Sequence, residues 1–197
     1  MEFSGSESPQ LLIRRAPSFA SARIFAGGVD LALISLVPAM VARTSVAEPI
    51  LALALVSAMA LGTMLLQYPI AILADDYGLR KVSIIAATSV FLFFSLIPFF
   101  LDAIIITTLV ALFGAGLVYG LYSIAHSMLY RLFKSGETAV ANAGLIIIFE
   151  AANLLGPMIA GAFLDINFRL GLPTFIISMG VFYLTISWVR CHANLRE

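Results

Sequence analysis

Two carboxylates, Asp30 and Glu150, lie inside long apolar segments of this chain. An ionisable side chain within a bilayer is energetically expensive, so each one is a candidate functional residue. Loss of surrounding water favours the protonated form of a carboxylate, which lets the group bind and release a proton near neutral pH. We therefore interpret both acids as candidates for a proton pathway. Two structural alternatives stay open: Asp30, beside Gly27 and Gly28, as a hydrogen-bonded packing residue, and Glu150 as a polar contact between helices.

Polar and aromatic side chains recur at helical spacing in the segments around these acids. Asn153 follows Glu150 by three positions, so the two share one helix face. Tyr119, Tyr122 and His126 follow an i, i+3, i+7 pattern and share a face of another helix. Rings with polar tips bind substrates by stacking and hydrogen bonding, so we include these residues in a candidate substrate or proton pathway. The alternative, favoured for His126, is an interfacial position at the end of the helix.

Other chemistries lack the residues that they need. The two histidines, His126 and His192, and the single cysteine, Cys191, do not have metal-ligand spacing. The chain contains no Gly-x-x-x-x-Gly-Lys-Ser/Thr motif for nucleotide phosphates and no evident pairing of a nucleophile with a base. We expect neither enzyme activity nor a cofactor or metal. A formal net charge of zero gives no indication of a nucleic-acid partner.

The composition predicts an all-α integral membrane protein. Hydrophobic residues make up 61% of the 197 and charged residues 11%, and the mean hydropathy is +1.05. A soluble domain has roughly 25% charged residues, so lipid must cover most of this surface. Six stretches are long enough to cross the hydrocarbon, and they must be helical because every backbone polar group there needs an internal partner. We place them at 19–41, 50–74, 82–101, 103–125, 139–164 and 172–189.

The basic residues predict the orientation of this bundle. Cytoplasmic tails are expected at 1–18 and 191–197, on either side of a transmembrane bundle at 19–190. With six helices, nine basic residues fall on the side of the two termini: Arg14, Arg15, Arg23, Arg80, Lys81, Arg131, Lys134, Arg190 and Arg196. Only Arg43 and Arg169 fall on the other side. Because basic residues collect in cytoplasmic segments, we expect a cell inner-membrane protein with both termini in the cytoplasm.

A tight turn between the second and third predicted helices carries the first of two motifs. Its residues Asp75, Gly78 and Arg80 resemble the signature loop of the major facilitator superfamily, roughly G-x-x-x-D-R-x-G-R-R. The match is partial, since Asp76 replaces a cation of that pattern and Leu79 replaces an arginine. Local chemistry also suits a turn: Asp75 is expected to cap the next helix, and Gly78 permits a left-handed backbone.

The second motif lies in the fifth predicted helix. Glu150 is followed there by Gly156, Pro157 and Gly161, a pattern similar to the glycine-proline helix that is the fifth helix of each six-helix half in that superfamily. Glycine at these positions is expected to allow close helix packing.

The resemblance extends over all six predicted helices and is greatest to the C-terminal half of such a transporter. It implies two three-helix inverted repeats, a central cavity lined by helices one, two, four and five, and transport of a small molecule by alternating access. One half is incomplete, so the resemblance also implies a homodimer or a separate N-terminal six-helix half as partner. The alternative is a non-transporting membrane scaffold or a truncated remnant of a transporter.

Overall fold

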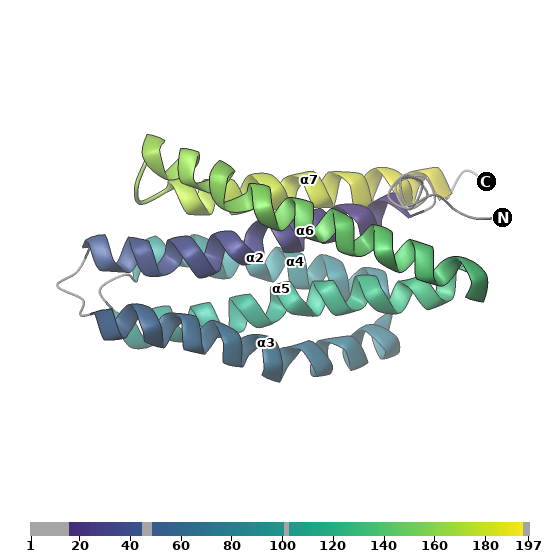
Figure 1. Cartoon of the computed structure of the whole chain (residues 1–197), viewed down its shortest axis with the longest axis horizontal. Helices are drawn as coiled ribbons and strands as arrows, with labels where there is room; N and C mark the ends of the chain where they lie inside the picture. Colours follow the sequence, from purple (N-terminus) through teal and green to yellow (C-terminus); the bar gives the residue numbers. More distant parts are fainter. Residues whose placement is uncertain (1–15, 45–48, 101–102, 195–197) are drawn as a thin grey trace.

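The computed structural model describes residues 16–44, 49–100 and 103–194, which form six long helices and no strand (Figure 1). All six are long and apolar enough to cross a membrane, as the sequence predicted, and we describe the chain as a multi-pass membrane protein. The helices are α2 (Pro17–Thr44), α3 (Pro49–Tyr77), α4 (Leu79–Leu96), α5 (Ile104–Leu132), α6 (Ser135–Ile166) and α7 (Gly171–Asn194), and the 3-10 turn η1 (Ile97–Phe99) follows α4.

The third helix is shorter than predicted. Its α-helical part ends at Leu96 rather than at 101, and Pro98 lies in the 3-10 turn that follows. Proline has no N–H, and its ring clashes with the carbonyl four residues earlier. Here the carbonyl of Phe94, four residues before the proline, accepts from the N–H of Ile97 instead, and the regular α-helix gives way to the 3-10 turn.

The fourth helix is longer than predicted. It continues to Leu132, and the next helix begins at Ser135, so all of the loop predicted at 126–138 except residues 133–134 is helical. The break comes at Phe133, whose backbone is extended. Hydropathy marks where a helix leaves the hydrocarbon, whereas the helix itself continues into the polar region until its backbone pattern breaks.

Close helix packing is concentrated in two pairs, α2 with α6 and α3 with α5 (Figure 1). A Cβ placed on Gly156 of α6 would collide with the backbone carbonyl of Gly28 in α2. One placed on Gly62 of α3 would collide with the carbonyl of Leu112 in α5. Glycine is required at these contacts because only it lets two helix backbones approach so closely.

The second glycine of the motif does not make such a contact. A Cβ at Gly161 would meet nothing within 4 Å, so this residue makes no close helix contact among the described residues. Gly161 lies five positions after Gly156, on a different side of the helix. Pro157 is half-buried inside α6, which continues through it.

Helix α2 is the centre of the bundle. Its membrane span is 72% buried, against 28% to 50% for the other five. Phe25, Val29 and Leu33 are at most 1% exposed and belong to the main core. By contrast, α3 exposes large apolar side chains such as Met64 and Leu65, as expected of a helix in contact with lipid. A polar side chain on α2 is thus enclosed by neighbouring helices.

The turn between α3 and α4 differs in one respect from the sequence prediction. Gly78 has the expected positive φ, 99°, and it is the N-cap residue of α4. No side chain caps this helix, so the predicted capping by Asp75 is wrong. Asp75 instead pairs with Arg131 at the end of α5, 2.9 Å away, with both side chains about half exposed. Such exposed ion pairs contribute little to folding stability, about 0–1 kcal/mol.

Candidate functional site

Asp30 and Tyr119 join α2 to α5 in the interior of the bundle. The Tyr119 hydroxyl donates a hydrogen bond to Oδ2 of Asp30 over 3.2 Å, and Asp30 is only 6% exposed. Beside them lies a cavity of about 160 Å³ that also reaches Met59 and Thr63 of α3. This volume holds several water molecules or a small polar group. The carboxylate thus has one hydrogen-bond donor and adjoining space for an exchangeable ligand.

Tyr122 and His126 hold a guanidinium nearer the start of α2. The Cζ atom of Arg23 lies 3.5 Å from the centroid of the Tyr122 ring, a cation–π contact. Arg23 Nη2 lies 3.0 Å from Nδ1 of His126. Since a guanidinium has no acceptor, Nδ1 must accept this hydrogen bond and carry no proton. Arg23 is fully buried, and its Nε and Nη1 atoms have no hydrogen-bond partner in the part of the chain that the structure describes.

These residues form one continuous stripe, which we call the α2–α5 stripe: Arg23, Asp30, Tyr119, Tyr122 and His126. Arg23 and Asp30 are seven positions apart and share a face of α2. On α5, the ring centroids of Tyr119 and Tyr122 are 6.0 Å apart, and those of Tyr122 and His126 are 6.1 Å apart. An acid near one end is therefore connected to a cation at the other by packed, polar-tipped rings.

His126 is not at a helix end. It precedes the last residue of α5, Leu132, by six positions, because this helix is longer than predicted. The predicted loop does not begin at 126, but a helix can continue past the membrane boundary, so the interfacial position of His126 stays a prediction.

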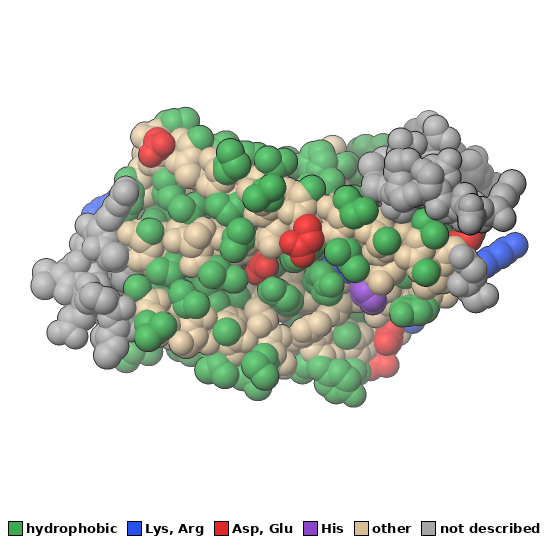
Figure 2. Space-filling model, viewed as in Figure 1, with side chains coloured by type: hydrophobic (Ala, Val, Ile, Leu, Met, Phe, Trp, Pro, Cys, Tyr) green, Lys and Arg blue, Asp and Glu red, His purple; other side chains and the backbone are tan. Residues whose placement is uncertain are grey.

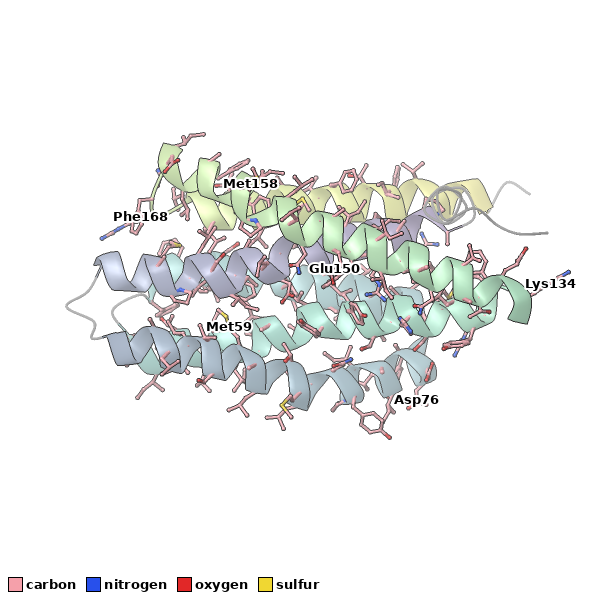
Figure 3. The ribbon with its side chains drawn as sticks, viewed as in Figure 1. Met59, Asp76, Lys134, Glu150, Met158 and Phe168 are labelled. Carbon is pink, nitrogen blue, oxygen red and sulfur yellow. The ribbon has the colours of Figure 1, made fainter. Side chains whose placement is uncertain are left out.

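The two candidates on α6 have different surroundings. Asn153 accepts a hydrogen bond from the backbone N–H of Leu31, 3.1 Å away, so it is a polar contact between α6 and α2. Glu150 is exposed, points from the middle of α6 (Figure 3), and makes no hydrogen bond or ion pair with the described residues. The preceding residue, Phe149, lies over the guanidinium of Arg23, with its ring centroid 5.7 Å from Cζ, so this part of α6 lies beside the stripe. Figure 2 shows acidic, basic and histidine side chains gathered on this face, over α6, α2 and α5.

Sequence reasoning missed Arg23, which was assigned to the cytoplasmic cations. A signal was present: Arg23 lies four positions inside the predicted first span and seven positions before Asp30, on the same face. What the sequence did not contain was the register of α5, which brings Tyr122 and His126 to this arginine.

Comparisons of the chain with protein-family models, with curated proteins and with solved structures found no match. The function is therefore inferred from the geometry of the site.

Proposed function

We propose that this chain is one half of a secondary transporter that moves a small molecule, together with protons, by alternating access. The observation that supports this most strongly is the α2–α5 stripe with Glu150 beside it. A charged side chain at the centre of a membrane helix costs about 2.5–3.5 kcal/mol on insertion scales. An exposed Glu150 next to a buried Asp30 and Arg23 is costly in contact with lipid alone. A water-filled cavity between two bundles would remove that cost.

The pairing of the helices supports the superfamily resemblance. Two three-helix repeats would relate α2, α3 and α4 to α5, α6 and α7, in that order. Under this correspondence the pair α2–α6 becomes the pair α5–α3. These are the two most extensively packed pairs in the bundle. The other neighbours follow the same exchange: α4–α5 becomes α7–α2, and α3–α4 becomes α6–α7. Such a pattern is expected of two three-helix inverted repeats. In this proposal α2, α3, α5 and α6 line the cavity, and the stripe lies among them.

A second six-helix bundle is part of the proposal. Alternating access rocks one bundle against another around a site at the midplane. Because six helices place both ends of the chain on one side of the membrane, a second copy has the same orientation and can supply the opposite wall. A separate N-terminal half can do the same.

The position of the basic side chains supports cytoplasmic termini. Arg80, Arg131 and Lys134 all lie at the helix ends where α2 begins and α7 ends, whereas Arg169 lies at the opposite end (Figures 1 and 3). Removing Arg23 from this comparison, since it is buried inside the bundle, leaves eight of the remaining ten basic residues on the proposed cytoplasmic side.

Transport can be tested in liposomes that contain the purified full chain and a pH-sensitive dye. Sugars, organic cations and carboxylates are added in turn, and the lumenal pH is followed. We expect at least one solute to change the lumenal pH, and Asp30→Asn and Glu150→Gln each to slow that change at least tenfold. Full rates in both variants would remove these residues from the mechanism. Absence of solute-driven pH change in the wild type, together with a strictly monomeric chain, would favour the non-transporting scaffold.

A further inference from the structure

A second polar site lies at the end of the bundle where α2 begins, away from the α2–α5 stripe. It is a pocket of about 250 Å³ between α2, α4, α5 and α7. Its polar lining consists of Ser18, Arg80, Ser83, Tyr183 and Ser187. None of the lining residues is acidic. Pocket and stripe share no residue, so a ligand here would be independent of the proposed transport path.

Arg80 provides positive charge that no carboxylate among the described residues neutralises. Its guanidinium donates a hydrogen bond to the backbone carbonyl of Ser187, and it makes no ion pair with the described residues. Asp75, in the preceding turn, is engaged with Arg131. A guanidinium has five N–H donors in a planar fork that matches a phosphate or carboxylate. Donors therefore remain for an anion in the pocket.

A buried hydroxyl group adds a further donor to the same pocket. The hydroxyls of Ser83 and Tyr183 have no donor to spare, because Ser83 donates to the backbone carbonyl of Arg80 over 3.2 Å and Tyr183 donates to Ser83 over 2.6 Å. The Ser187 hydroxyl lies near that of Tyr183, but it is only 1% exposed and its oxygen has no hydrogen-bond partner of normal geometry among the described residues. A buried polar group without a partner is unfavourable, by about 1–3 kcal/mol. A ligand oxygen beside Arg80 would accept from this hydroxyl and remove the penalty.

An apolar groove of about 450 Å³ continues from this pocket along the outside of α4 and α7. Ile84, Leu184 and Trp188 line it, and Trp188 is 63% exposed. Arg80 and Ser187 line both the groove and the pocket, so the two meet at these residues. A ligand that fills both must combine a negative head with a hydrocarbon chain. Tryptophan at such a junction is typical of the membrane–water interface.

We propose that this pocket and groove bind an anionic phospholipid, with the phosphate between Arg80 and Ser187 and an acyl chain between α4 and α7. Basic pockets between membrane helices on the cytoplasmic side are suited to acidic lipid headgroups. The site lies at the lipid-facing surface of the bundle, so the ligand reaches it by lateral diffusion. The apolar groove distinguishes a lipid from a soluble phosphate, because only the lipid fills it.

Native mass spectrometry of the detergent-solubilised chain, titrated with phosphatidylglycerol or phosphatidylcholine, tests this site. We expect phosphatidylglycerol to bind about tenfold more tightly than phosphatidylcholine, and Arg80→Gln to remove that preference. Lys81→Gln is the matched control, because it removes a neighbouring charge that does not line the pocket, and it should change binding less than twofold. Equal binding of the two lipids, or equal effects of the two substitutions, would overturn the proposal.

Further variants and a competition with inorganic phosphate distinguish binding of the whole lipid from binding of a soluble anion. They also keep the test valid if Arg80→Gln does not fold. Leu184→Trp fills the groove and is expected to weaken phosphatidylglycerol binding several-fold. Arg80→Lys keeps a positive charge and should retain part of the preference. Inorganic phosphate at millimolar concentration should not displace the bound lipid. Displacement by phosphate, or no effect of Leu184→Trp, would identify the ligand as a soluble anion and overturn the lipid assignment.

Discussion

The Nη2 atom of Arg23 lies 3.0 Å from Nδ1 of His126, and this hydrogen bond joins α2 to α5 in the interior of a membrane-spanning bundle. Arg23 can only donate, so the bond exists only while Nδ1 of His126 carries no proton. A second proton on the imidazole would make both groups donors and place two positive charges side by side. The contact between α2 and α5 is therefore sensitive to the protonation of one side chain that is half-buried at the stripe.

Replacement of Arg23 by methionine is predicted to remove transport without loss of stability. The guanidinium is fully buried, two of its nitrogen atoms have no partner among the described residues, and an apolar side chain of similar length has no such penalty. Substitution of buried charges by apolar residues of similar volume is often neutral or stabilising, by about 1–4 kcal/mol. Thermal unfolding in detergent should give an unchanged or raised midpoint, while the liposome assay loses its signal.

The control for this prediction is Arg23→Lys. It keeps the charge but has a point-like ammonium in place of the planar fork that stacks on Tyr122. We expect it to fold with some residual transport. A fall in stability of more than about 3 kcal/mol for Arg23→Met would instead identify the arginine as a structural residue.

The hydrogen bond between Tyr119 and Asp30 is predicted to couple the two residues energetically. Tyr119→Phe and Asp30→Asn each remove one partner, and a double-mutant cycle isolates their interaction. A hydrogen bond to a charged group contributes about 1.5–3 kcal/mol. We expect a coupling free energy of about 1 kcal/mol or more in denaturant unfolding. Tyr68→Phe, on the 73% exposed Tyr68, should show no coupling to Asp30→Asn.

Substitution of glycine by alanine in α6 is predicted to have opposite effects at two positions. At Gly156 the new methyl group collides with the backbone of Gly28, so we expect overpacking to lower the free energy of unfolding by about 1–3 kcal/mol. At Gly161 there is open space, and alanine should raise the free energy of unfolding by about 0.5–1 kcal/mol because it restricts the unfolded chain and favours the helix. Unfolding midpoints of the two variants test this directly. Equal shifts would show that α2 and α6 are not packed as described.

The sequence predicted the features that depend on one helix at a time. Six apolar stretches predicted six helices, and the i, i+3, i+7 spacing correctly placed Tyr119, Tyr122 and His126 on one face. It did not predict features that depend on how two helices meet. Arg23 is buried because Tyr122 and Phe149 from two other helices enclose it.

The same limit applies to residues whose roles were predicted from a local motif or turn. Gly156 and Gly161 look equivalent in the motif, yet only Gly156 faces α2. Asp75 precedes α4 by four positions and is suited to cap it, but its carboxylate pairs instead with Arg131 of α5. Each outcome depends on a partner that is distant in the sequence.

Glu150 provides the most direct test of whether water or lipid covers the face of the bundle that carries the α2–α5 stripe. If this face borders an aqueous cavity, a cysteine at 150 will be in water and able to ionise, and only the thiolate reacts with a thiol reagent. The native Cys191 is first replaced by serine, and Glu150→Cys is then introduced into that background. Reconstituted in liposomes, this variant should react with a charged, membrane-impermeant thiosulfonate.

The matched control is Val181→Cys on α7, which is 56% exposed and lies near the middle of its helix. Its side chain belongs to the face that we expect to contact lipid, where a thiol stays protonated and a charged reagent does not enter. We expect labelling at 150 to be at least tenfold faster than at 181. Equal, slow labelling at both positions would mean that lipid or a tightly packed partner covers Glu150, and an open transport cavity on this face would be excluded.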